Sequence, residues 1–391
     1  MLRNRTYERV LDTARDQSTG RPRYRDRPNA EHYQLYEARD ITRSPGSFPL
    51  QSDMKNDPRL ITKALRRHIN GTLIVVLSLV FLQTVSAVQA ETVLKKASFV
   101  PQWLPQAQFA GYMVALEKGF YREVGLDLTL MVGGPGKPPF VLLGSGEATF
   151  CTDWLSNGIE KRASGHRVVN LAQVVQRSAL MLVAKKKSGI EHPRDLNGKN
   201  VGLWAGQFYL QPMAFFRKYD IKVNIIPNYS SVSIFLKGGV DAMSTMWYNE
   251  YHTILNSGLN SDDLSLFFFS RVGLNFPEDG IYCLEETFRA DPGLCERFVR
   301  ASLEGWLYAF DNQEEAIQIV MKHAEAAHTG TNKAHQRWML ARMKDLIIPD
   351  EDKSNLGKLE PADYALVADI LKDFRLIDAI PQFEEFYRGP R

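Results

Sequence analysis

The chain contains 391 residues, of which 48 are Lys or Arg and 45 are Asp or Glu. These charges are unevenly distributed, because residues 1–90 hold 15 basic and 9 acidic residues and residues 91–391 hold 33 and 36. The larger part is therefore mildly acidic, which argues against nucleic-acid binding, since that function requires a concentrated basic face. The length permits two ordinary domains, or one domain of two lobes that follows an export segment.

An export signal lies inside the chain rather than at its first residue. Residues 63–68 are positively charged, residues 72–82 form an apolar run of signal-peptide length, and residues 88–90 place small side chains where a signal peptidase cleaves. The apolar run is shorter than the roughly 20 residues that span a bilayer. We therefore expect residues 54–90 to be a signal peptide and residues 91–391 to be periplasmic; an uncleaved membrane anchor is the alternative.

The segment before this signal, residues 1–53, is polar, rich in Arg and Pro, and without apolar periodicity. We expect it to be disordered, or to lie upstream of the true start at Met54. No cysteine lies directly after the apolar run, where a lipid anchor would be attached, which argues against a lipid-anchored lipoprotein.

Short β-rich runs alternate with helical stretches up to residue 284. The expected strands are 95–100, 126–132, 148–151, 168–175, 180–184, 199–203, 223–227, 241–245, 264–269 and 280–284. The expected helices between them are 109–120, 138–144, 155–163, 208–219, 232–237 and 247–256. The rest of the chain is almost wholly helical, with helices expected at 292–310, 313–327, 333–346 and 361–371.

Strands that alternate with helices predict an α/β fold with a mainly parallel sheet covered on both faces. Two such units followed by a helical tail can form two lobes. We expect residues 91–185 to begin the first lobe, residues 186–284 to form the second, and residues 285–391 to return to the first lobe as a helical segment. The two crossovers between the lobes would then lie at residues 185–187 and near Leu284.

The ligands of open α/β sheets bind beyond the carboxyl ends of the strands. This rule places several loops around one cleft between the lobes. The loops are 101–109, 133–137, 152–154, 204–209, 247–250 and 274–279.

The sequence carries no recognisable catalytic or metal-binding pattern. Cys151, Cys283 and Cys295 have neither CxxC spacing nor companion histidines, so we expect no metal site. Cys283 and Cys295 could form a disulfide in an oxidising compartment, but three buried thiols are the preferred interpretation. No nucleophile elbow, HExxH motif or paired Asp-x-Asp occurs. We therefore expect no cofactor and no enzymatic activity.

Three sequence phrases follow one another in the order seen in type II periplasmic binding proteins: GYMVALEKGFYREVGLDLTL at 111–130, LLGSGEATF at 142–150 and PRDLNGKNVGLW at 193–204. More narrowly, the chain resembles the group that binds nitrate, sulfonates, taurine or the pyrimidine precursors of thiamine. MWYNEY at 246–251 is similar to a segment of the pyrimidine-binding branch. The resemblance covers about residues 94–375. It implies a monomer that holds a solute between two hinged lobes and delivers it to an inner-membrane ABC permease and its ATPase.

The same superfamily includes an enzyme branch that makes the thiamine pyrimidine and consumes its own active-site histidine. That branch carries a cysteine-rich iron-site motif, which this chain lacks, and Asn157 lies where the histidine is expected. The resemblance therefore implies a binding protein rather than a synthase.

Glu250 is the first candidate for contact with the solute. By the resemblance it would accept hydrogen bonds from a ring amine or amide, since a buried carboxylate suits an N–H donor. The alternative is a solvated glutamate on a helix face. Asn249 could make the contact instead, and Trp247 belongs to the same candidate segment.

Aromatic and amide residues follow the first expected strand. Trp103 could stack on a flat ring, and Gln106 and Gln108 could bind the polar atoms of that ring. Tyr112 lies one helical turn further on. The alternative is that Trp103 and Tyr112 pack in the core of the lobe.

Two further loops supply candidates. Asp153 is expected to cap the helix that follows it, and Trp154 is expected to face the cleft. Trp204, Phe208 and Tyr209 belong to an aromatic loop at the start of a helix. Such a loop suits a flat organic ring better than an oxyanion, which would favour free backbone N–H groups.

These residues favour a planar N-heterocycle as the solute, such as a thiamine pyrimidine precursor or a flavin. A small anion such as a sulfonate, taurine or nitrate is the second candidate, because its site would need cations and the expected cleft loops contain no arginine. The pyrimidine synthase is the third candidate.

Overall fold

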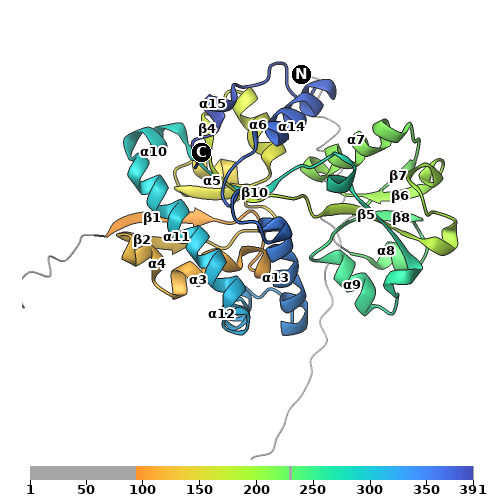
Figure 1. Ribbon diagram of the computed structural model, residues 1–391, viewed down its shortest axis with the longest axis horizontal. Helices are drawn as coiled ribbons and strands as arrows, with labels where there is room; N and C mark the ends of the chain where they lie inside the picture. The colour runs from red at the N-terminus through yellow and green to blue at the C-terminus, as the bar shows by residue number, and fades with distance from the viewer. Residues whose placement is uncertain (1–93, 229–230, 391) are drawn as a thin grey trace, which may run out of the picture. The chain divides into compact units, whose positions relative to one another are not determined.

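Two five-stranded sheets organise residues 94–228 and 231–390, the part of the chain that the computed structural model describes (Figure 1). The expected signal peptide at 54–90 and the extension at 1–53 lie outside the described residues. Among the residues that are described, no helix combines the length and the apolar character needed to cross a bilayer. The expected two-lobed α/β fold class is confirmed by the two sheets and the helices that cover them.

The first sheet contains β1 (Lys95–Val100), β2 (Leu126–Leu130), β3 (Phe150–Asp153), β4 (Val168–Val175) and β10 (Glu278–Leu284). Its strand order is β2-β1-β3-β10-β4. β1 runs parallel to β2 and β3, whereas β10 runs antiparallel to β3 and β4. Every residue of β4 is buried, the polar Asn170 and Gln173 included, which explains why its sequence does not alternate between apolar and polar residues.

The second sheet contains β5 (Leu180–Lys185), β6 (Asn200–Leu203), β7 (Asn224–Pro227), β8 (Ala242–Met246) and β9 (Leu264–Phe268). Its strand order is β7-β6-β8-β5-β9. β6 runs parallel to β7 and β8, and β5 runs antiparallel to β8 and β9. The two sheets thus share one plan, in which the fourth strand of the order, β10 or β5, runs antiparallel to both of its neighbours.

The chain crosses between the sheets directly after β4 and directly before β10. β5 pairs within the second sheet, and β10 pairs within the first. The expected crossovers at residues 185–187 and near Leu284 are therefore wrong, each by the length of one strand. The reason is physical: β5 and β10 are buried along almost their whole length, and local periodicity does not determine which of two sheets such a strand joins.

Most helices pack on the first sheet, and the helices that follow β10 all belong to that lobe (Figure 1). The helices before the first crossover are α3 (Ala110–Glu117), α4 (Phe120–Glu123), α5 (Pro139–Gly144) and α6 (Leu155–Ala163). Those after β10 are α10 (Glu285–Ala290), α11 (Pro292–Asp311), α12 (Gln313–Ala326), α13 (Lys333–Ile347), α14 (Pro361–Asp373) and α15 (Phe383–Phe386). The second lobe holds α7 (Leu210–Tyr219), α8 (Ser233–Leu236) and α9 (Glu250–Asn256).

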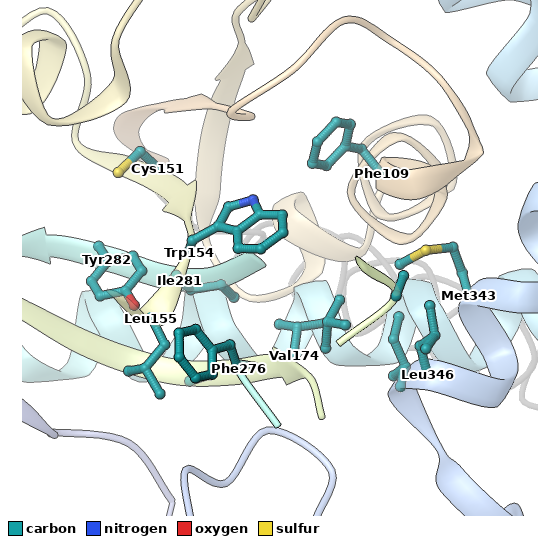
Figure 2. Close-up of a cluster of buried hydrophobic side chains, with 14 of the residues drawn as sticks. Phe109, Cys151, Trp154, Leu155, Val174, Phe276, Ile281, Tyr282, Met343 and Leu346 are labelled. Atoms are coloured by element: carbon teal, nitrogen blue, oxygen red, sulfur yellow. The ribbon is translucent and has the colours of Figure 1, made fainter. Parts of the chain in front are cut away.

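A buried cluster in the first lobe joins segments that are far apart in the sequence (Figure 2). Phe109 precedes α3, Val174 lies in β4, Ile281 lies in β10 and Met343 lies in α13, and all four are fully buried. Trp154 lies among them. Each side chain of this size contributes about 1.5–3 kcal/mol when it is buried, so the cluster ties the returning strand and α13 to the lobe that begins the described chain.

The three cysteines are buried and free. The Sγ atoms of Cys283 and Cys295 lie 4.0 Å apart, which is hydrogen-bonding distance for sulfur and about twice the length of a disulfide bond. The structure therefore agrees with three buried thiols rather than with a disulfide.

Two glycines allow α3 and α11 to pack in direct backbone contact. A Cβ atom added at Gly305 would lie 2.1 Å from the carbonyl oxygen of Gly111, and one added at Gly111 would lie 2.3 Å from the ring of Trp306. Neither contact is sterically possible, so any larger side chain must push the helices apart.

Gly305→Ala is expected to lower the free energy of unfolding by about 1–3 kcal/mol, the usual cost of overpacking a core. Chemical denaturation followed by circular dichroism measures this change. Gly144→Ala, at the end of α5, is the matched control, because an added Cβ there would meet no atom within 4 Å. Equal stability of the two variants would contradict the close approach of α3 and α11.

Candidate ligand-binding site

A pocket of about 280 Å³ lies between the lobes, beyond the carboxyl ends of strands from both sheets. Residues after β1, β6, β7 and β8 line it, so the strand-end rule accounts for its position. The lining residues are Gln102, Trp103, Gln106, Gln108, Trp204, Ala205, Phe208, Asn228, Met246, Tyr248, Asn249 and Glu250.

Aromatic rings form much of the wall. Trp103 comes from the first lobe, and Trp204, Phe208 and Tyr248 come from the second. The rings of Trp204 and Phe208 meet edge to face, with centroids 5.5 Å apart, and Trp154 packs edge to face behind Phe208 at 5.1 Å. This edge-to-face contact holds Phe208 in place and leaves the pocket lined by flat apolar surfaces.

A chain of amides bonded to Asp279 orients the polar groups of the first lobe. Gln106 Nε2 donates to Gln108 Oε1 at 2.6 Å, and Gln108 Nε2 donates to Asp279 Oδ2 at 2.7 Å. Gln102 Nε2 donates to the other carboxylate oxygen of Asp279 at 3.0 Å. The amide nitrogens are thus engaged, and the carbonyl oxygens of Gln102 and Gln106 are left out of this chain, in position to accept a hydrogen bond.

Glu250 is the acidic group of the second lobe. Only 7% of its surface is exposed, so the alternative of a solvated helix-face residue is wrong. Its Oε2 accepts from the backbone N of Met246 at 2.9 Å, and its Oε1 accepts from Asn249 Nδ2 at 2.8 Å. Burial raises the pKa of Glu250 to about 7, against 4.5 for an ordinary glutamate, and these hydrogen bonds limit the rise.

Among the described residues that line the pocket, none is Arg or Lys, so no basic side chain in its wall balances the charge of Glu250. Asn228 Nδ2 is buried and has no hydrogen-bond partner among the described residues, so it is a donor available to a ligand. The described part of the chain also contains no group of three or more His, Cys, Asp or Glu side chains that could hold a metal ion.

The structure brings together five of the residues predicted for the site. Trp103, Gln106, Trp204, Asn249 and Glu250 all line the pocket. Their contact with a solute stays a prediction, because the geometry places the side chains without identifying what they bind.

Four other predicted residues do not line this pocket. Tyr112 is buried in the first lobe against Phe99 and Trp306, which is the core position weighed as its alternative. Trp154 is 1% exposed and lies behind Phe208 rather than at the pocket surface. Tyr209 is exposed and is not among the lining residues.

Trp247 is the fourth. It lines a separate charged hollow and stacks under the guanidinium of Arg342, which lies 4.8 Å from the ring centroid. Met246 and Tyr248 line the pocket instead. Side chains of neighbouring residues in a strand point to opposite sides. Trp247 therefore faces the charged hollow, while Met246 and Tyr248 face the pocket.

Asp153 does not cap α6 in the expected way. Trp154 is the N-cap residue of α6, and it forms no side-chain cap. Asp153 Oδ1 instead accepts hydrogen bonds from the backbone N of Trp154 at 2.8 Å and from Asn157 Nδ2 at 2.9 Å. Burial raises the pKa of Asp153 to about 7.

Sequence reasoning missed Asn228, Met246 and Tyr248 as lining residues. Asn228 directly follows an expected strand at 223–227, so the strand-end rule applied to that strand would have found it. Tyr248 lies between Trp247 and Asn249, which were both predicted, and only the direction of its side chain determines that it lines the pocket. No local signal identified Met246.

Comparison with known proteins gives one family. Residues 106–316, just over half of the chain, match the model of the family described as NMT1/THI5 like. A formylaminopyrimidine-binding protein from Halalkalibacterium halodurans is 24% identical over 268 residues, which cover 66% of this chain and 80% of that protein. The riboflavin-binding protein RibY from Chloroflexus aurantiacus is 23% identical over 254 residues, covering 62% and 71%.

Enzymes occur among the similar proteins as well. The 4-amino-5-hydroxymethyl-2-methylpyrimidine phosphate synthase of Legionella pneumophila is 22% identical over 284 residues, which cover 67% of this chain and 85% of that enzyme.

The solved structures that match include periplasmic binding proteins. The aliphatic sulphonate binding protein SsuA from Escherichia coli matches 75% of this chain and 97% of its own, with a TM-score of 0.59 and 14% identity. A putative periplasmic sulfonate-binding protein from Methylobacillus flagellatus covers 76% and 92%, with the same TM-score and identity. At this level of identity, the likeness shows that the described residues have the fold of periplasmic solute-binding proteins.

Glu250→Gln is expected to change how stability depends on pH. The pKa of Glu250 is about 7 in the folded protein, so the folded state holds this proton more tightly than the unfolded chain does. Wild-type stability should therefore fall as the pH rises from about 4.5 to about 7 and stay at the lower level above that pH. The variant does not titrate there, so its stability relative to wild type should rise by up to about 3 kcal/mol over this range.

Denaturant unfolding at several pH values measures this difference. A constant offset from altered hydrogen bonds to Met246 and Asn249 does not affect the pH dependence. Glu296→Gln, at an exposed position on α11, should show no change with pH relative to wild type. A pH-independent difference for Glu250→Gln would show that folding does not raise the pKa of Glu250.

Proposed function

The chain belongs to the NMT1/THI5-like family, and we propose that it is the exported solute-binding component of an ABC importer, holding a small planar N-heterocycle between its two lobes. The observation that carries this proposal is the combination of flat aromatic walls with one buried carboxylate and no lining cation among the described residues.

The pocket's chemistry supports a flat, uncharged or cationic ring. Trp103 from the first lobe and Trp204 and Phe208 from the second can contact the faces and edges of such a ring, and each aromatic pair adds about 0.5–1.5 kcal/mol beyond buried area. Glu250 would accept from a ring amine, and Asn228 Nδ2 would donate to a ring nitrogen or carbonyl. A pyrimidine with an exocyclic amine presents both kinds of group.

The size of the pocket favours the smaller of the two expected heterocycles. Its volume of about 280 Å³ is at the lower end of the range for small-molecule sites. A single-ring thiamine pyrimidine precursor fits this volume more readily than a three-ring flavin. The names of two similar proteins, a formylaminopyrimidine-binding and a riboflavin-binding protein, support the broader class.

The other two functions are less compatible with the site. A sulfonate, taurine or nitrate would enter a pocket with an acidic group on its wall and no lining Arg or Lys among the described residues, so electrostatics oppose its binding. For the synthase, Asn157 lies where the resemblance expects the reactive histidine, and its side chain is bonded to Asp153. We therefore assign no catalytic residue and no cofactor.

The remaining parts of this proposal concern export and partners. Residues 54–90 would direct the chain to the periplasm, and residues 91–391 would act there as a monomer. The loaded protein would dock on an inner-membrane permease, whose ATPase drives release. Two short crossovers between the lobes support a hinge of the kind that such proteins use.

Isothermal titration calorimetry on the full chain tests the proposal. The probes are formylaminopyrimidine, 4-amino-5-hydroxymethyl-2-methylpyrimidine, riboflavin, taurine and nitrate. We expect at least one heterocycle to bind. Glu250→Ala should weaken that binding about 10- to 100-fold, because a hydrogen bond to a charged group is worth about 1.5–3 kcal/mol.

Glu296→Ala, which removes an exposed glutamate from α11, should leave the affinity unchanged. Binding of taurine or nitrate alone would overturn the heterocycle proposal, and so would heterocycle binding that is indifferent to Glu250→Ala.

A further inference from the structure

Two histidines from different lobes meet beside the pocket. His252 lies on α9 of the second lobe and His335 lies on α13 of the first, and their Nδ1 atoms are 2.9 Å apart. The other ring nitrogen of His335, Nε2, lies 2.7 Å from Asn249 Oδ1. Asn249 in turn donates from Nδ2 to Glu250 Oε1 at 2.8 Å. A continuous path of hydrogen bonds therefore runs from the contact between the lobes to the pocket carboxylate.

When Glu250 is ionised, the direction of every bond in this path is fixed by chemistry. An ionised carboxylate can only accept, so Asn249 must point its amide nitrogen at Glu250 and its carbonyl oxygen at His335. His335 Nε2 must then carry a proton. A neutral imidazole has one N–H, so His335 Nδ1 is an acceptor and His252 Nδ1 is the donor to it. Asn256 Nδ2 lies 3.3 Å from His252 Nδ1 and 3.4 Å from His252 Nε2, and in this tautomer it donates to Nε2.

Burial favours the neutral form of both rings. It lowers the pKa of His252, and it lowers the pKa of His335, where the neighbouring charge of His252 would act in the same direction. Glu250 of α9 is joined to the pair through Asn249. Tyr251 of α9 and Arg342 of α13 lie against Trp338 rather than against the histidines.

Other contacts at the same place also cross between the lobes. The ring of Trp338 on α13 stacks on His252, with centroids 4.9 Å apart and planes inclined by 8°. Trp338 Nε1 donates to the backbone oxygen of Trp247 at 3.2 Å. Opening of the hinge would separate all of these groups at once, because α9 and α13 belong to different lobes.

We propose that His335 is a positioning residue for the pocket: reaching across from the first lobe, it fixes Asn249 and, through Asn249, the carboxylate of Glu250 in the geometry that receives the solute. His252 fixes the tautomer of His335. The acceptor of the second lobe is thus fully oriented only while the first lobe is in contact with it, which couples closure of the lobes to recognition. The consequence for solute affinity rests on the proposed function, but the hydrogen-bond path does not.

Nitrogen-15 NMR of the full chain with labelled histidine tests the path without any ligand. At pH 7.5 we expect His335 in the Nε2–H form and His252 in the less common Nδ1–H form, with assignments made from His252→Gln and His335→Gln. Two rings that both show the averaged signals of an exposed histidine would overturn the proposal.

Calorimetry with 4-amino-5-hydroxymethyl-2-methylpyrimidine, or whichever heterocyclic probe binds wild type, tests the consequence. His335→Ala should weaken binding about tenfold. His335→Gln should restore most of it, because the Gln amide can donate to Asn249 from nearly the same position. His323→Ala is the control, since His323 is half-buried on α12 and bonds Glu117 instead.

Unchanged affinity for His335→Ala, or equal loss for Ala and Gln, would overturn the positioning role. If no heterocycle binds wild type while both tautomers are as expected, the proposed function fails and the hydrogen-bond path stands.

Discussion

The geometry of the pocket depends on how the chain crosses between its lobes, and one buried carboxylate holds that crossing. Glu278 is 1% exposed, and its Oε1 accepts from the hydroxyl of Ser178 at 2.9 Å and from the backbone N of Ala179 at 2.6 Å. Ser178 and Ala179 lead out of the first lobe, whereas Glu278 begins the strand that returns to it. Burial, and then the charge of Asp279, raise the pKa of Glu278 to about 8. The two crossings are therefore tied together at a cost in desolvation that the hydrogen bonds offset only in part.

The next residue extends this constraint to the pocket. Asp279 has φ of 48°, a left-handed conformation that Asp tolerates better than most residues. Its carboxylate accepts hydrogen bonds from Gln102 and Gln108, the amides of the first-lobe wall. Burial raises the pKa of Asp279 to about 6. Adjacent carboxylates thus set both the crossing and the polar side of the pocket, and a concentration of buried titratable groups in one cleft is typical of functional sites.

The strands and helices could be predicted because their signals are local. The expected helix at 155–163 and the expected strand at 168–175 coincide with α6 and β4. The sheet to which β5 and β10 belong could not be predicted, since pairing is a long-range property that the local pattern of neither strand determines. For the site, the strand-end rule found Trp103, Trp204 and Glu250. It failed for Trp154 and Trp247, because that rule selects a loop and leaves undetermined which way each side chain turns.

Each lobe contributes a different half of the pocket wall. The first lobe supplies Trp103 and the amides held by Asp279, and the second supplies Trp204, Phe208 and Glu250. A ligand that contacts both halves binds the closed arrangement better than any open one, and this difference in affinity is the only source from which closure can be driven. The hydrogen bond from His335 to Asn249 lies at the same junction. This hydrogen bond joins the first lobe to the acceptor of the second, so the same few contacts contribute to the free energy of binding and to the free energy of closure. A ligand that does not contact Glu250 would therefore gain no affinity from closure through these contacts.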